Sequence, residues 1–195
     1  MPPLNANPRY GKFPSSQVYL IYGNNEAEVN NLRFELVSAI LTPEERDAGL
    51  TEIRSPGNAP LTLRGSLSEM IGELGTSSFI AGSRRVLVVY DLKDFYESRP
   101  SRGKKTTKAT APKKETGGDV FASFAEWMKN VLPTTENIVV FVCQENDEKQ
   151  RVVSEQSDIY QLCQQLGHVI VKREKSLNYE FEDLIFSRNV NGAVT

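Results

Sequence analysis

The sequence has 195 residues, 39% of them hydrophobic and 25% charged, and a formal net charge of −2. This length allows one principal core and little more. No stretch approaches the roughly 20 apolar residues that a membrane span needs, so a transmembrane protein is excluded. The polar N-terminal extension, residues 1–17, lacks the basic-then-apolar order of a secretory signal, and we expect a cytoplasmic protein.

The first predicted unit is a strand, a tight turn and a helix. The apolar run Val18–Tyr22 is β-prone and stops at Gly23, which is typical of a buried strand. Asn24 or Asn25 can then cap a helix, because either side chain can accept a hydrogen bond from the first helical turn. Apolar residues recur at helical spacing from 29 to 41, which gives this helix one buried face.

The alternation of strand and helix continues along the chain. Continuous apolar strands separated by amphipathic helices predict right-handed crossovers and a parallel sheet with helices on both faces. We therefore expect a three-layer α/β/α domain of the P-loop NTPase type over residues 18–188. Further strands are predicted at 50–54, 85–90, 138–142 and 168–172, and further helices at 63–74, 120–131, 152–165 and 179–188.

The first turn, Gly23–Glu28, occupies the position at which a P-loop cradles phosphates. A working P-loop needs two glycines, a lysine for the terminal phosphates and a serine or threonine for magnesium. Only Gly23 remains here, and Glu26 and Glu28 would repel a nucleotide. The sequence therefore predicts a degenerate nucleotide site, with neither ATP nor another cofactor.

Few residues suit a catalytic or metal site. Cys143, Cys163 and His168 cannot form a zinc set and are predicted to be packing residues. Asp91 ends an apolar strand as a Walker B acid does, but no glutamate follows it, so a strand-terminating turn is favoured. The enzyme alternative is a Toprim-like metal-dependent nuclease or primase domain that uses Asp91 and Asp94. A Toprim-like site also needs a glutamate on the first strand, and the first predicted strand of this chain contains none.

Segment 97–118 is basic and has little apolar surface. It carries seven basic residues against two acidic ones, and it has too few apolar side chains to offset the entropy of ordering. We predict a disordered basic insert, which is either a solvated loop or an arm that contacts DNA phosphates. The DNA-contacting residues would be Arg99, Arg102, Lys104, Lys105, Lys108, Lys113 and Lys114.

Several segments together carry a family resemblance. They are Val18–Gly23 with its acidic helix start, Ser78–Val89, Trp127–Pro133, the strand Ile138–Val142, Asn146–Lys149 and Leu166–Val169. Their order resembles the N-terminal domain of the delta subunit of the bacterial DNA polymerase III clamp loader, over roughly residues 18–188. The resemblance implies an AAA+ core with a degenerate nucleotide site and no catalytic activity of its own, since polymerase activity belongs to the holoenzyme.

The resemblance also implies a role in DNA replication. Delta subunits bind the ring-shaped sliding clamp (beta) and help to open it, through an exposed apolar pair that precedes a strand with two arginines. The matching residues are Phe79 and Ile80, with Leu74 as a further contact. An exposed apolar pair fits a protein-binding hot spot, and the alternative is that it caps the edge of the sheet.

The chain departs from the family pattern in three ways. It has Phe-Ile where Leu-Phe is common, one extra residue before the arginine pair, and the basic insert. The family also continues into a small helical domain and a collar domain. We therefore expect residues 189–195 to be a tail toward those domains, and other clamp-loader subunits to be partners through the collar.

Overall fold

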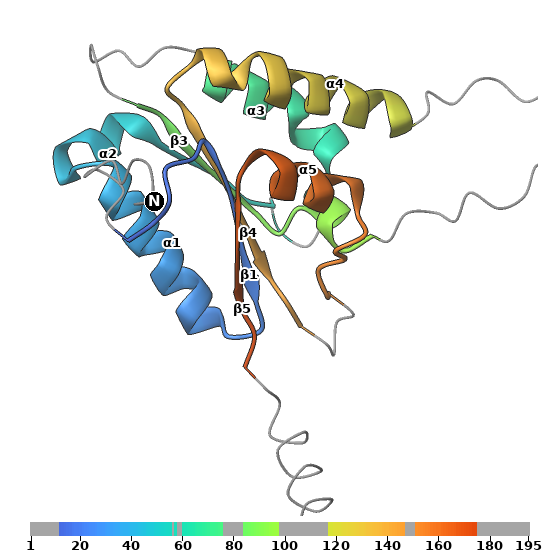
Figure 1. The fold of residues 1–195 in the computed structure, drawn as a ribbon, viewed down its shortest axis with the longest axis horizontal. Coiled ribbons are helices and arrows are strands. Elements are labelled where there is room, and N and C mark those ends of the chain that lie inside the picture. The colour runs from blue at the N-terminus through green and yellow to red at the C-terminus, as the bar shows by residue number, and fades with distance from the viewer. Residues whose placement is uncertain are drawn as a thin grey trace, which may run out of the picture.

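The computed structural model describes residues 12–55, 57, 60–75, 84–97, 117–146 and 151–174, with the backbone only for 117–119 (Figure 1). Within these ranges five strands form one sheet in the order β2-β3-β4-β1-β5. Every pairing in it is parallel, as the apolar strand runs predict. The strands are β1 (Val18–Gly23), β2 (Leu50–Ile53), β3 (Val86–Tyr90), β4 (Ile138–Gln144) and β5 (His168–Lys172).

Helices cover both faces of the sheet, which confirms the predicted three-layer architecture. Figure 1 shows α1 and α2 on one side of the strands and α3, α4 and α5 on the other. None of the helices in the described ranges is long and apolar enough to cross a membrane. The helices are α1 (Glu26–Ile40), α2 (Pro43–Gly49), α3 (Leu63–Gly75), α4 (Gly117–Asn130) and α5 (Asp158–Leu166), and short 3-10 turns follow at Lys93–Phe95 and Leu132–Thr134.

The core consists of two apolar layers, one on each side of the sheet. Along β1 alternate residues enter opposite layers, so Leu20 packs under α3, α4 and α5 while Ile21 packs under α1. Cys143 and Cys163 are buried free thiols within the first layer, and burial raises the pKa of both. Both cysteines are therefore packing residues, as predicted.

The structure corrects two helix assignments. The segment from 152 is a loop, and α5 begins only at Asp158, because the Ser157 side chain caps it by accepting from the backbone N–H of Tyr160. Helix α2 was not predicted. It has a capping box in which Thr42 and Glu45 each bond the other's backbone N–H.

The ends of the predicted basic insert are part of the fold. Glu97 forms an ion pair of 2.8 Å with Lys93, and α4 begins at Gly117. The rest of the insert lies outside the described residues, and so do residues 1–11 and the helix predicted at 179–188.

Gly167, which precedes β5, offers a test of how closely β5 approaches β1. A Cβ at Gly167 would lie 2.1 Å from the backbone oxygen of Val18, and a backbone atom cannot step aside. We expect Gly167→Ala to lower the free energy of unfolding by about 1 to 3 kcal/mol, because the two strands must separate. Urea denaturation is the measurement.

Gly72→Ala is the matched control, since a Cβ at this exposed position of α3 would meet nothing within 4 Å. It should raise stability by about 0.5 to 1 kcal/mol, because alanine favours a helix over glycine. Equal effects of the two changes would contradict the close approach of β1 and β5.

Candidate functional site

The turn after β1 is closed by the chain that follows β5. A Cβ on Gly23 would lie 1.8 Å from the backbone oxygen of Lys172, so only glycine fits where these two strands end. The Asn24 side chain donates to the backbone oxygen of Glu174 at 3.0 Å and accepts from its N–H at 2.7 Å. Asn25 caps α1 through the N–H of Glu28, and its amide also donates to the Glu174 carboxylate. Protein groups therefore fill the place where a P-loop would hold phosphates.

The charge around this turn is also unsuited to a nucleotide. Glu26 and Glu28 are exposed in the first turn of α1, and Glu28 pairs with Lys172 at 3.2 Å. The nearby cation is thus already neutralised by a carboxylate of the same turn. This arrangement agrees with the degenerate nucleotide site that the sequence predicts.

An ion pair between a buried carboxylate and an exposed arginine reinforces the same edge of the sheet. Glu145, which follows β4, is only 5% exposed, and its carboxylate accepts two hydrogen bonds of 2.7 Å from the Arg173 guanidinium. It also accepts from the N–H of Val153 at 2.9 Å. The hydrogen bond to Glu145 raises the pKa of Arg173, whose guanidinium lies 5.2 Å from the ring centre of Tyr22. We call this contact the Glu145–Arg173 pair; it fixes the segment after β5 against the ends of β1 and β4.

The two aspartates of the predicted nuclease alternative have separate structural tasks. Asp91 accepts hydrogen bonds of 2.8 Å from the Gln144 backbone and the Tyr96 hydroxyl, while Asp94 accepts from the N–H of Leu63 at the start of α3. Across the residues that the structure describes, no three His, Cys, Asp or Glu side chains gather to hold a metal. Asp91 therefore ends a strand, as expected, and Asp94 caps a helix.

The predicted clamp-binding pair, Phe79 and Ile80, lies in segment 76–83, outside the described residues. Leu74, the third predicted contact, is fully buried between α3 and the sheet. Its position corrects the prediction, because the apolar spacing of α3 turns Leu74 toward the core. The seven basic residues proposed to contact DNA, between 99 and 114, also lie outside the described residues.

Asn137 joins the end of α3 to the residue before β3, on either side of segment 76–83. Its side chain is 5% exposed; the amide donates to the Leu74 backbone oxygen at 2.7 Å and accepts from the Arg85 N–H at 3.0 Å. Arg85 also pairs with Glu73 at 3.2 Å. The end of α3 and the start of β3 are therefore held together at the amino edge of the sheet. No pattern in the sequence marks Asn137, because its partners lie far from it along the chain.

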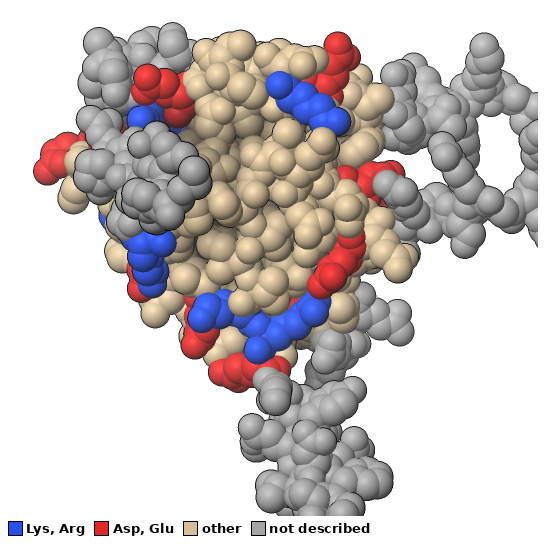
Figure 2. Space-filling view, viewed as in Figure 1, with Lys and Arg blue, Asp and Glu red and all other residues tan. Residues whose placement is uncertain are grey.

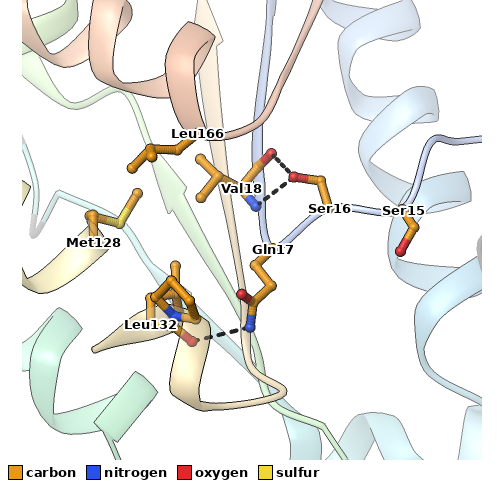
Figure 3. A pocket seen from close by; sticks show the side chains of 8 residues that line it. Ser15, Ser16, Gln17, Val18, Met128, Leu132 and Leu166 are labelled. Atoms are coloured by element: carbon orange, nitrogen blue, oxygen red, sulfur yellow. Dashed lines mark hydrogen bonds between the residues drawn. The ribbon is translucent and has the colours of Figure 1, made fainter. Parts of the chain in front are cut away.

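Gln17 binds the backbone at and before Asn137, and Figure 3 shows its contact with Leu132. Its side-chain amide donates to the backbone oxygens of Leu132, Thr135 and Asn137, at 3.1, 2.6 and 3.2 Å. Figure 3 shows this contact at the side of a pocket of about 360 Å³ between α4, α5 and the start of β1. The pocket's lining combines polar residues, Ser15, Ser16 and Gln17, with apolar ones, and it includes no charged residue among those that the structure describes.

The surface around β5 is poor in charge. On the face shown in Figure 2, charged side chains lie mainly near the margins, and the middle, over α5 and β5, is largely uncharged. Val171 on β5 is 45% exposed there. His168, at the start of the same strand, lies with its ring 6.2 Å from that of Tyr19, which agrees with the predicted structural role.

The comparisons with known proteins add a fold relationship. No family model matches the sequence, and no curated protein matches it either. Among solved structures, the chain is similar to the Bacillus subtilis DNA clamp loader delta protein (YqeN), with a TM-score of 0.52 and 12% identity. The match covers 82% of this chain and 39% of that protein, so the chain spans well under half of its length. The likeness shows that the two chains share an α/β fold.

The Glu145–Arg173 pair can be tested by neutralising the buried partner. Glu145→Gln keeps the shape but removes the charge that Arg173 faces. Because the Arg173 side chain is 41% exposed, water offsets part of the loss, and we expect a decrease in unfolding free energy of about 1 to 2 kcal/mol. Urea denaturation measures it.

The control for this change is Glu155→Gln. Glu155 lies 4.0 Å from Arg173 but is 60% exposed, so its loss should cost about 0.5 kcal/mol or less. A larger effect from Glu155 than from Glu145 would show that the Glu145–Arg173 pair does not hold this edge.

Proposed function

We propose that this chain is a clamp-loader delta-like domain that binds a sliding DNA clamp and helps to open it during DNA replication, without hydrolysing ATP. The observation that carries the proposal is the fold likeness to a DNA clamp loader delta protein. The closed turn at Gly23 supports a binding role over catalysis, because the ligand edge of the P-loop type is filled by residues 172–174.

The proposed clamp contact is the pair Phe79 and Ile80 alone. Leu74 is excluded from it by burial. An apolar pair in a connection between α3 and β3 is costly to leave in water, which favours a partner surface. The bonds of Asn137 to Leu74 and Arg85 bring the two ends of this connection together, and a loop closed at its base loses less entropy on binding.

Further partners follow from the same proposal. Other clamp-loader subunits would assemble with a longer chain through its collar domain. DNA would be contacted by the basic residues Arg99–Lys114 through its phosphates, and that binding should weaken steeply with salt.

The double change Phe79→Ala and Ile80→Ala tests the clamp contact. Removing an aromatic anchor from the centre of an interface costs roughly 2 to 4 kcal/mol, so clamp binding in calorimetry should be lost. The melting temperature should hardly move, because exposed side chains change stability by about 0.5 kcal/mol or less.

Two outcomes would contradict this assignment. If the double variant binds the clamp with unchanged affinity, Phe79 and Ile80 are not the clamp contact. A large fall in melting temperature would place Phe79 and Ile80 in the core, since a buried phenylalanine contributes about 3 to 5 kcal/mol.

Asn137→Ala tests whether the closed base of the connection matters for binding. We expect clamp affinity to fall about tenfold, because the freed segment must then be ordered on binding. The Asn137→Ala change also removes buried hydrogen bonds and therefore lowers the free energy of unfolding. Gly167→Ala is the control, because it should be destabilising too. Gly167 precedes β5, which β1 separates from β4 and Asn137 in the sheet. If both variants, measured well below their melting temperatures, bind the clamp equally, Asn137 has only a structural role.

A further inference from the structure

A second hollow lies at the carboxyl edge of the sheet, where β2 and β3 end. It has a volume of about 310 Å³, and its lining includes Arg54, Ser55, Gly57, Tyr90, Asp91 and Arg151. Ligands of parallel α/β sheets bind at this edge, and the turn after β1 at the same edge is filled by the chain itself. The hollow is therefore a place at this edge where the described residues leave room for a ligand.

Two arginines from separate segments line this hollow. Arg54, directly after β2, lies 3.9 Å from the ring centre of Tyr90 and donates through one terminal nitrogen to Glu52 at 3.0 Å. This contact holds the guanidinium flat while using one of its five donors. Arg151 is exposed and is fixed through its backbone, which exchanges two hydrogen bonds with Asn146. Its side chain has no ion-pair partner among the residues that the structure describes.

The acids near the hollow are already engaged. Glu52 is shared by Arg33 and Arg54, each at 3.0 Å, and also accepts from the Tyr90 hydroxyl. Asp91 uses one oxygen to accept from Gln144 and Tyr96. The charged residues of the lining, two arginines and one aspartate, leave a net positive charge.

The backbone at Asp91 gives an independent indication. Its φ is +48°, a value that residues other than glycine rarely adopt, and no other non-glycine residue in the described ranges has a positive φ. Such strained residues gather at ligand sites, where surrounding contacts hold them in place. Here the contacts that hold Asp91 come from the end of β4 and from Tyr96, beside the hollow.

We propose that this hollow binds the phosphate group of a small phosphorylated molecule, with Arg54 and Arg151 as the two cationic contacts. A guanidinium fork matches phosphate oxygens, and a phosphate group carries enough charge to engage both arginines. The concave volume is at the low end of small-molecule pockets, roughly 300 to 1,000 Å³, and suits a small ligand better than a rod of duplex DNA. The site is independent of the proposed clamp contact, because it shares no residue with Phe79, Ile80 or the flanking Leu74 and Arg85.

The test is a titration of the whole 195-residue chain with inorganic pyrophosphate, followed by the backbone amide shifts in nuclear magnetic resonance. We expect saturable shifts at Gly57, Tyr90 and Asp91. Arg151→Gln should weaken the binding by about tenfold or more, since it removes a charge-assisted contact. Arg151 carries the test because its side chain makes no bond needed for folding within the described residues, whereas Arg54→Gln also frees Glu52 and Tyr90.

Lys129→Gln on α4 is the matched control, because it removes the same charge from an exposed position on another element. It should leave the pyrophosphate affinity unchanged. The proposal is overturned if no saturable shift appears at millimolar pyrophosphate, or if Lys129→Gln weakens binding as much as Arg151→Gln. It is also overturned if a single-stranded oligonucleotide shifts these amides and pyrophosphate does not. Clamp binding enters none of these measurements.

Discussion

The burial of β1 on both faces is the constraint on which the rest of the structure depends. This strand lies between β4 and β5, and its residues Val18–Tyr22 are at most 2% exposed. Because helices cover both faces, each side chain must fill one of two layers, and the neighbouring backbones approach closely at both ends. Gly23 and Gly167 mark those ends, since neither has room for a Cβ. The close approach of β5 at Gly23 also fills the turn after β1, where a P-loop would hold phosphates.

The two edges of the sheet are closed by different chemistry. At the carboxyl edge the buried carboxylate of Glu145 needs a partner, and Arg173 supplies it with two hydrogen bonds. At the amino edge the neutral amide of Asn137 satisfies two backbone groups at the ends of one connection. The carboxyl edge is thus locked by the chain itself, and the amino edge carries the connection that we propose to contact a clamp.

Most elements could be predicted from the sequence because their signals are local. The apolar runs of the strands and the helical spacing after Asn25 hold without knowledge of distant contacts. Two predictions were wrong for local reasons. Helix α2 was not predicted, although Thr42 begins a capping box. The helix predicted from residue 152 begins only at Asp158, where Ser157 caps it. Val153, in the loop before α5, is buried in an apolar layer and its N–H donates to Glu145, and no periodicity predicts this contact.

The turn after β1 and its surroundings also combine features that the local sequence predicts with features that depend on distant contacts. The sequence by itself determined that the first turn has only Gly23 of a P-loop and that acids follow it, because those residues are contiguous. Only the tertiary structure decided that residues 172–174 fill that turn and that Asn137 joins α3 to β3. Each of these depends on backbones more than 60 residues apart meeting in the sheet, and side-chain pattern along the chain carries no record of such distances.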